Sequence, residues 1–398
     1  MDRRKREERK AWLTLTLIVV LVVVAALFLT KDFREYLRDY EAFQEYKKYM
    51  MSQNNNPNGE GNPEADDSLA FAESTPQPEE SQTPEQTAPP SDESEAPKTD
   101  TGPQHYEVLA GSQTLCDVSG NVIWQADTIS PETAELLRGY VQERNLVYIW
   151  QNSYEKTLKI NELDKKILET AGCAFPNVKI NFVGDSVTEG VGGNQDAEGR
   201  QISYVNYVQE MLQFGEVCNN GRAGATIAGY NNNDELAIGA HEDELFVKDS
   251  DITVFYAGLN DFLTNVEVKN FGVLDNGTTG GYCGQLQKII NSLNTKYPNT
   301  LFFFVTAYQT PNTSQTKEYT NFEGIPTLND YMNPLRTLAQ QNGYPIIDLY
   351  SIGLMDMHDA ATAENLLADS IHPNDAGYRI LGEHIAAEIL LYCLGIVG

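Results

Sequence analysis

Short, mainly apolar runs alternate with longer amphipathic stretches through the second half of the chain. The runs are four to seven residues long and rich in Val, Ile and Phe, which is typical of strands buried on both faces. The stretches between them place apolar residues at helical spacing. The predicted strands are 178–183, 216–219, 252–257, 300–306 and 346–349, and the predicted helices are 204–214, 283–295, 327–342 and 375–394. This alternation predicts an α/β fold with a parallel sheet that helices cover on both faces.

The N-terminal pattern is different and predicts a membrane anchor. Residues 11–30 are 20 consecutive residues without a charge, and at about 1.5 Å per residue they span the roughly 30 Å hydrocarbon core of a bilayer as a transmembrane helix. Residues 1–10 carry six Arg or Lys and three acidic residues, so the positive-inside rule predicts a cytoplasmic N-terminus. A cleavable signal peptide is the alternative, but the apolar core is long for one and no clear cleavage site precedes Lys31. We expect an uncleaved, single-pass anchor in the cell membrane, with the rest of the chain outside.

Three segments of different composition connect this anchor to the α/β part. Residues 31–51 carry equal numbers of acidic and basic residues and aromatic residues at helical spacing, which predicts a juxtamembrane helix near the lipid interface or in a short coiled coil. Residues 52–104 contain twelve acidic residues and one lysine among Pro, Ser, Thr and Gln, and predict a disordered linker with a mean reach of roughly 40 Å. Residues 105–175 show a hairpin-like stretch and two helical patterns, the first capped by Ser130. We expect them to pack as an N-terminal extension on a domain of residues 176–398.

Candidate chemistry lies in two segments far apart in the chain. The segment Gly184–Ser186 follows the first predicted strand, and ligands collect at the carboxyl ends of strands in open α/β sheets. Asp369 and His372 stand together just before the last predicted helix. A serine hydroxyl needs an imidazole to accept its proton, and the imidazole needs a carboxylate to orient it. The alternatives are an ordinary loop serine and an Asp–His pair that only caps the helix.

Gly224 and Asn260 follow the next two predicted strands and are candidate donors for an oxyanion hole. Acyl transfer places negative charge on the former carbonyl oxygen, and each preorganised N–H donor aimed there lowers the barrier by about 3 kcal/mol. A glycine amide and an asparagine side-chain amide are suitable donors, although either residue alone is typical of an ordinary turn. The neighbouring Asp261 would repel the developing charge, so we expect it to point away and to hold the loop.

The order of these four segments resembles that of the SGNH hydrolases, also called the GDSL esterase/lipase family, over residues 177–394. The resemblance implies a three-layer αβα flavodoxin-like sandwich with a five-stranded parallel sheet. It implies a serine esterase that needs no cofactor. By this resemblance Ser186 is the nucleophile, His372 is the base that accepts its proton, and Asp369 is the partner of that base. The oxyanion donors are the backbone amides of Ser186 and Gly224 and the side-chain amide of Asn260. Ala223 departs from the serine that many relatives carry before the glycine, but the donor there is a backbone amide.

Charge and cysteine content narrow the list of partners. The chain has a net charge of −29, which disfavours nucleic acid as a partner because nucleic-acid binding requires a basic surface. Five cysteines cannot all pair within one chain, so at least one is free or intermolecular. Cys218 and Cys393 fall in apolar runs and are expected in the core. No clustered His and Cys spacing predicts a structural zinc or another metal site.

These features together predict a membrane-anchored, extracytoplasmic serine esterase that removes a short acyl group, such as acetyl, from a glycan or another cell-surface ester. The alternatives are a lysophospholipase or lipase, an O-acyltransferase that acts on a cell-wall glycan, and a non-enzymatic surface binder. A lipase prefers long acyl chains, and an acyltransferase hands the acyl group to a sugar. A binder would not be labelled at Ser186 by a fluorophosphonate.

Overall fold

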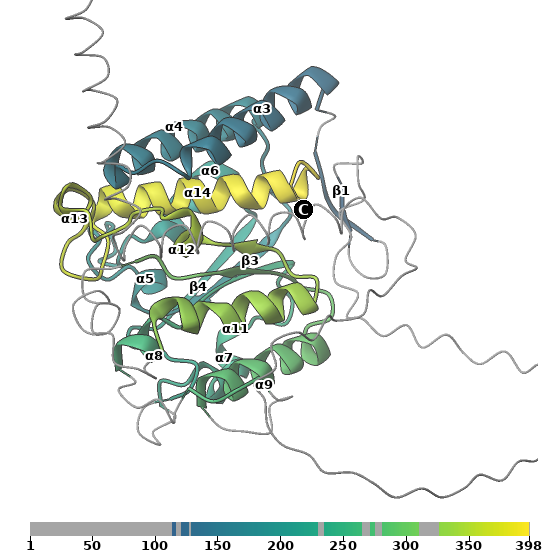
Figure 1. The fold of residues 1–398 in the computed structure, drawn as a ribbon. Helices are drawn as coiled ribbons and strands as arrows, with labels where there is room; N and C mark the ends of the chain where they lie inside the picture. Colours follow the sequence, from purple (N-terminus) through teal and green to yellow (C-terminus); the bar gives the residue numbers. More distant parts are fainter. Residues whose placement is uncertain are drawn as a thin grey trace, which may run out of the picture. The chain divides into compact units, whose positions relative to one another are not determined.

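The computed structural model describes residues 114–116, 121–126, 129–229, 235–264, 271–274, 281–309 and 326–397 (Figure 1). The predicted tail, transmembrane helix, juxtamembrane helix and linker, residues 1–104, lie outside these ranges. Within them, no helix combines the length and the apolar character that a membrane crossing requires. Membrane attachment therefore stays a prediction from the sequence.

A five-stranded parallel sheet forms the centre of the fold (Figure 1). In spatial order its strands are β4 (Glu216–Gly221), β3 (Lys179–Gly184), β5 (Ile252–Tyr256), β6 (Leu301–Val305) and β7 (Ile346–Ile347). Numbered along the chain this order is 2-1-3-4-5, the flavodoxin-like arrangement. The predicted parallel sheet is confirmed, and the predicted strand ends lie within two residues of the observed ones.

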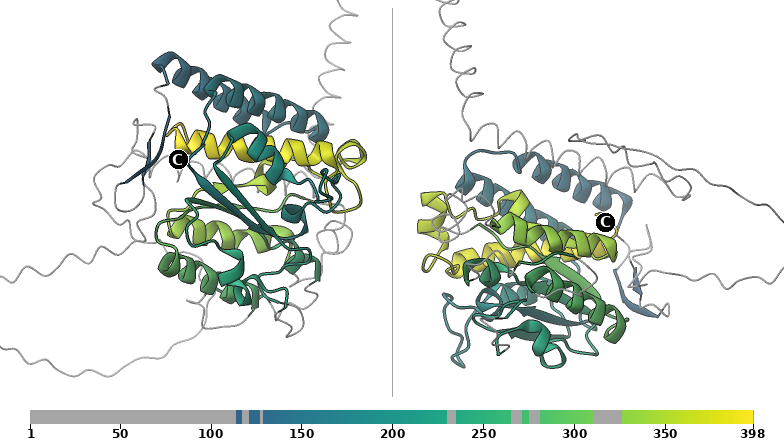
Figure 2. Two further views of the ribbon diagram at one scale, coloured as in Figure 1. Left: turned by 180° about the vertical axis from the view of Figure 1, so that it is seen from behind. Right: turned by 60° about the horizontal axis from the view of Figure 1, so that its bottom comes forward.

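Helices cover both faces of the sheet, so the predicted three layers are present. Helices α6 (Tyr204–Leu212) and α14 (Asp375–Cys393) pack together on one face, and α9 (Gly281–Lys296) and α11 (Leu328–Gln341) pack together on the other (Figures 1 and 2). Short helical segments occupy the connections. They are α5 (Ser186–Glu189), η1 (Ile238–Ala240), α7 (Glu242–Leu245), α8 (Leu259–Thr264), α12 (Leu349–Ile352) and α13 (Ala360–Leu366). The sequence did not predict these segments, because a single turn is too short to show helical periodicity.

Strand β6 shows how the layers are joined. All five of its residues are buried, because neighbouring residues of a strand point to opposite faces and both faces are covered. On one face, the ring centroid of Phe303 lies 5.3 Å from that of Tyr392 in α14. On the other face, the ring centroid of Phe302 lies 5.5 Å from that of Tyr344, a residue just after α11. The aromatic residues of this run are core residues, as predicted.

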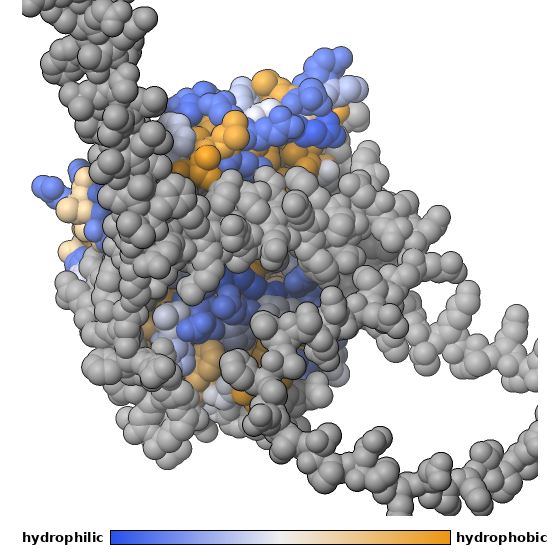
Figure 3. Space-filling view, in the orientation of Figure 1, coloured by the Kyte–Doolittle hydropathy of each residue, from blue (hydrophilic) through white to orange (hydrophobic). Residues whose placement is uncertain are grey.

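Residues before the sheet add a hairpin and a helical pair. The hairpin joins β1 (Thr114–Cys116) to β2 (Val122–Gln125), and the helical pair is α3 (Pro131–Val147) and α4 (Ser153–Ala171). Ser130 is the N-cap of α3, as predicted. Helix α4 packs on α14, so the pair forms a further layer outside the sandwich (Figures 1 and 2). The described surface over α3 and α4 mixes hydrophilic and hydrophobic residues (Figure 3).

A buried group of charged side chains joins this layer to α14. The Arg144 guanidinium lies 2.5 Å from one carboxylate oxygen of Asp164 and also pairs with Glu388. The other Asp164 oxygen lies 2.8 Å from Nδ1 of His384. Burial alone would raise the pKa of Asp164, but His384 and Arg144 hold that pKa below its ordinary value. The ion pairs thus compensate the cost of burying these charges, which is large when a partner is missing.

One expectation about the positions of the cysteines was wrong. All five are described, and none of them forms a disulfide within the described residues. Cys393 is fully buried at the end of α14, as predicted for a core thiol. Cys218 was expected in the core but is only partly buried, because β4 is an edge strand. The apolar run around Cys218 did not reveal that its strand lies at the edge of the sheet.

Candidate active site

The loop after β3 forms a sharp turn that places Ser186 at the carboxyl end of the sheet. Asp185 caps α5, and its Oδ1 accepts a hydrogen bond from the Val187 amide at 2.9 Å. At Gly184 a Cβ atom would lie 2.1 Å from the Thr188 hydroxyl, so no larger residue fits there. Ser186 is the first residue of this helical turn and is 9% exposed. The local sequence therefore presents one hydroxyl at the surface of an otherwise buried loop.

The loop between α13 and α14 brings His372 to this hydroxyl. Nε2 of His372 lies 2.9 Å from Oγ of Ser186, and Nδ1 lies 2.8 Å from Oδ2 of Asp369. The other Asp369 oxygen accepts hydrogen bonds from the amides of Ile371 and His372, both at 2.7 Å. Three residues predicted from two distant segments thus form one hydrogen-bonded chain.

These contacts decide between the two interpretations of the Asp–His pair. Asn374, not Asp369 or His372, caps α14, since its side chain accepts a hydrogen bond from the Gly377 amide at 3.1 Å. Burial alone would raise the pKa of Asp369, but the hydrogen bonds from His372 and Ile371 keep that pKa below its ordinary value. Asp369 is therefore ionised near neutral pH and can orient the imidazole and stabilise it when it is protonated.

Two contacts that the sequence did not predict position the histidine loop. The Tyr308 hydroxyl, just after β6, donates to the Ile371 carbonyl at 2.9 Å. A Cβ atom at Gly192 would lie 3.0 Å from Cβ of His372, so the loop after Ser186 packs directly against the histidine. The only sequence signal for Tyr308 is its place behind a buried strand, which is typical of core residues as well.

Gly224 lies in a β-turn at the end of β4. The turn covers residues 222–225 and is closed by a hydrogen bond from the Ala225 amide to the Arg222 carbonyl at 2.9 Å. Gly224 is its third residue and has a φ of +79°, which a type II turn requires and glycine adopts without strain. Among the described residues, the Gly224 amide has no hydrogen-bond acceptor, so it can serve a bound oxygen.

Asn260 and Asp261 lie in the first turn of α8, at the end of β5. The Asn260 side-chain amide donates to the Ala225 carbonyl at 3.0 Å, so it adjoins the Gly224 turn. The Asp261 carboxyl accepts from the amides of Ile227 and Ala228, both at 2.8 Å, and holds the segment after that turn, as expected. Because β4, β3 and β5 are neighbours in the sheet, the three predicted oxyanion donors come from adjacent strand ends.

Two fully buried carboxyl groups lie behind these loops. Burial raises the pKa of Asp185 to about 7, and the nearby Asp261 adds to the effect. Burial likewise raises the pKa of Asp261 to about 7, against the lowering effect of its two amide donors. Within the described part of the chain, Oδ2 of Asp185 is buried without a hydrogen-bond partner. The sequence did not reveal that the residue before Ser186 is isolated from solvent.

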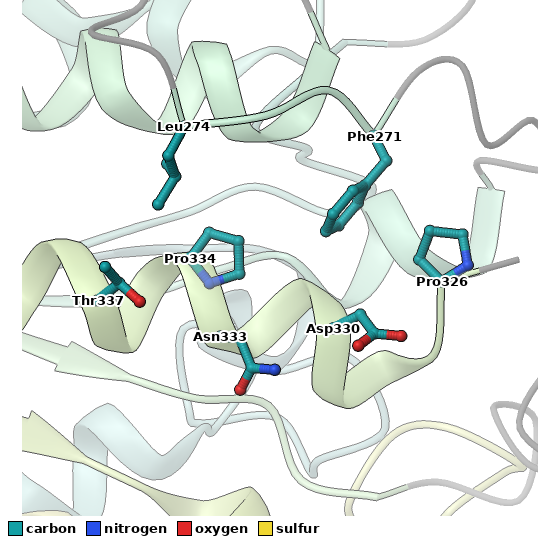
Figure 4. A pocket seen from close by; sticks show the side chains of 7 residues that line it. All are labelled: Phe271, Leu274, Pro326, Asp330, Asn333, Pro334 and Thr337. Carbon is teal, nitrogen blue, oxygen red and sulfur yellow. The ribbon is translucent and has the colours of Figure 1, made fainter. Parts of the chain in front are cut away.

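A separate cavity of about 580 Å³ opens between the 271–274 segment and α11 (Figure 4). It is lined by Phe271, Leu274, Pro326, Asp330, Asn333, Pro334 and Thr337. None of the predicted site residues lines it. Two of its polar side chains already have partners, because the Asp330 carboxylate binds Thr327 and the Asn333 carbonyl oxygen accepts from Arg336. Among the described residues, no cluster of metal-ligating side chains is found.

The chain is similar to several solved structures. Three solved structures with similar folds are a Lactobacillus plantarum protein, an acetylxylan esterase from Geobacillus stearothermophilus and a possible lipase from Chitinophaga pinensis. They are 21%, 20% and 18% identical, with TM-scores of 0.45, 0.40 and 0.41. The matches cover 53%, 54% and 55% of this chain and 95%, 95% and 100% of the other chains. No curated protein matches the sequence.

The sequence of residues 182–380, half of the chain, matches the GDSL-like lipase/acylhydrolase family. This range contains Ser186, Gly224, Asn260, Asp369 and His372, and the resemblance on which they were predicted is confirmed at the level of the family. The chain therefore belongs to the GDSL-like lipase/acylhydrolase family and is an ester-cleaving hydrolase.

Proposed function

We propose that the protein is a membrane-anchored, extracytoplasmic serine esterase that removes a short acyl group from a glycan or another polar cell-surface ester. The single observation that carries the catalytic part is the hydrogen-bonded chain from Ser186 through His372 to Asp369, with contacts of 2.9 and 2.8 Å. These distances are those of a nucleophile and base in hydrogen-bond reach.

The geometry leads to a two-step reaction. Nε2 of His372 takes the proton as Oγ of Ser186 attacks the ester carbonyl, and the carbonyl oxygen becomes an oxyanion. The amides of Ser186 and Gly224 and the side chain of Asn260 donate to that oxyanion. His372 then protonates the departing alcohol, which leaves an acyl group on Ser186. A water molecule, deprotonated by His372, attacks this acyl-enzyme, and the carboxylic acid leaves as Ser186 recovers its proton.

A polar substrate is supported by polar side chains on the loops around the site. Arg222 and Asn260 are both partly exposed and lie on the loops that carry the site. Polar groups of this kind suit a sugar better than a long alkyl chain, which requires an apolar lining. The acetylxylan esterase among the similar structures acts, by its name, on an acetylated glycan, and an acetyl ester is the substrate that we would test first.

The catalytic assignment is tested with Ser186→Ala, His372→Ala and the double variant. Each single change should remove nearly all ester hydrolysis, and the double variant should be hardly worse than either, because triad members act as a unit. Covalent labelling by a fluorophosphonate should require Ser186. Additive losses, or labelling that persists in Ser186→Ala, would contradict the assignment.

Substrate class is tested with p-nitrophenyl esters of increasing acyl length and with an acetylated glycan. We expect the highest kcat/KM for acetyl and a steep fall beyond butyryl. A maximum at long chains would favour a lipase or lysophospholipase instead. Acylated sugar, formed when a glycan acceptor is added, would identify an acyltransferase.

The location is tested by adding protease to intact cells. Residues 1–10 and 11–30 predict an inside N-terminus and an outward-facing enzyme. Cleavage within residues 52–104 should release a soluble, active fragment, because exposed polar segments are cut most readily. Protection until the membrane is permeabilised would place the enzyme in the cytoplasm, where a thioesterase activity would be the better interpretation.

A further inference from the structure

The direction of the Gly224 amide is not determined by its own turn. Type I and type II turns share the hydrogen bond from the fourth residue to the first, but the central peptide is rotated by about 180° between them. In the turn of residues 222–225 that central peptide joins Ala223 to Gly224 and carries the oxyanion N–H. Glycine accepts φ of either sign at little cost. Contacts from outside the turn must therefore restrain its two ends, so that this N–H can face the reaction centre.

Contacts after the central peptide hold the exit of the turn. Asn260 binds the Ala225 carbonyl, and Asp261 binds the amides of Ile227 and Ala228. These bonds restrain the chain beyond Gly224 but do not reach the Ala223 side of the peptide. The exit anchors therefore leave the first half of the turn to be held by other contacts.

The entry of the turn is held by the nucleophile's own helix. The Arg222 amide donates to the Gly184 carbonyl at 3.0 Å, and the Ala223 amide donates to Oε2 of Glu189 at 2.5 Å. Glu189 is the last residue of α5, three positions after Ser186. At Gly221 a Cβ atom would lie 2.2 Å from the Glu189 amide, so α5 and the end of β4 are in direct backbone contact. Glu189 thus links the helix of the nucleophile to the residue that precedes the oxyanion amide.

We propose that Glu189 is a positioning residue of the oxyanion hole, which holds the first half of the turn of residues 222–225 against α5 and so fixes where the Gly224 amide lies relative to Ser186. This inference rests on the proposed function. The role requires an acceptor oxygen rather than a charge, because a negative charge beside the site opposes the developing oxyanion.

The experiment compares Glu189→Ala and Glu189→Leu, which remove the acceptor, with Glu189→Gln, which keeps an acceptor oxygen without the charge. Full-length variants are assayed for kcat and KM with p-nitrophenyl acetate and for inhibition by a boronic acid, whose adduct with serine is tetrahedral. Glu244→Ala is the matched control, since the Glu244 carboxylate binds the side chain of Arg222 at 3.3 Å rather than a backbone amide of the same turn. Melting temperatures are measured for each variant.

Glu189→Ala and Glu189→Leu should lower kcat by about 10-fold to 100-fold, up to the loss expected for one oxyanion donor. KM should change little, and boronic acid affinity should fall in parallel with kcat/KM. Glu189→Gln and Glu244→Ala should stay near the wild type. If Glu189→Ala does not fold, Glu189→Leu decides the outcome. The inference would be overturned if Glu189→Gln and Glu189→Ala lost kcat equally. It would also be overturned if the effect were confined to KM, or if kcat were unchanged in the Ala and Leu variants. Wild-type turnover that does not need Ser186 would instead refute the proposed function.

Discussion

Replacing Asp185 with Asn should stabilise the protein at neutral and alkaline pH but not in acid. Asp185 is fully buried, and its pKa is raised from an ordinary value of 3.8 to about 7. Asparagine is nearly isosteric and keeps an acceptor for the Val187 amide, which binds Oδ1 at 2.9 Å. The other terminal atom is without a partner in the wild type and stays so in the variant. The comparison therefore isolates the charge.

The sign follows from proton linkage. The folded state binds the Asp185 proton more tightly than the unfolded state, so this proton stabilises the fold fully below pH 3.8. As the pH rises from there to about 7, the unfolded chain loses the proton first and the stabilisation disappears. The difference between the two pKa values corresponds to about 4 kcal/mol, at about 1.4 kcal/mol per pH unit. The asparagine side chain of the variant does not titrate and so escapes this loss.

The measurement is the free energy of unfolding by urea, for wild type and Asp185→Asn, between pH 4 and pH 9. The free energy of unfolding of the variant, minus that of the wild type, should be near zero at pH 4, grow to a few kcal/mol at pH 7 and then stay constant. Other titrating groups are common to both proteins and cancel in the difference, except Asp261, whose charge interacts with that of Asp185. Asp243→Asn, at a side chain that is 72% exposed, is the control and should follow the wild type within about 0.5 kcal/mol. A difference that does not vary with pH would refute the neutral Asp185.

Three further predictions concern the donors and the buried charges. Asn260→Ala should lower kcat by about 10²–10³ while fluorophosphonate labelling stays detectable, and a parallel loss of labelling would contradict a role in the transition state. Asp261→Ala should lower the melting temperature by several degrees in calorimetry, because two buried amides lose their acceptor at a cost of about 1–3 kcal/mol each. A fall in kcat with an unchanged melting temperature would contradict the structural role assigned to Asp261. Asp164→Ala should lower the free energy of unfolding in urea by about 3–5 kcal/mol, because Arg144 is left buried without this partner. Glu162→Ala, which removes an exposed ion pair, should lower it by under about 1 kcal/mol. Equal losses would show that the buried pair is not needed.

Much of the fold could be predicted because its signals are local. A strand covered on both faces is apolar at nearly every position, so runs such as 301–305 are visible without knowledge of their neighbours. Alternation with helices then implies a parallel sheet, since parallel strands need long crossover connections. The packing of α3 and α4 as a further layer was harder to predict. Arg144 and Asp164 are charged and look like a solvated helix face, and the partners of Asp164 are 20 and 220 positions away.

The sequence by itself determined which chemistry is possible: a serine after one strand, a glycine and an asparagine after two others, and an Asp–His pair before the last helix. It could do so because turn, cap and strand-end preferences depend on a few neighbouring residues. Only the tertiary structure decided that His372 reaches Ser186, that Asn374 rather than Asp369 caps the helix, and that Glu189 binds the Ala223 amide. It also decided that Asp185 is shielded from water. Distances, burial and protonation depend on which distant segments pack together, and no local pattern records that.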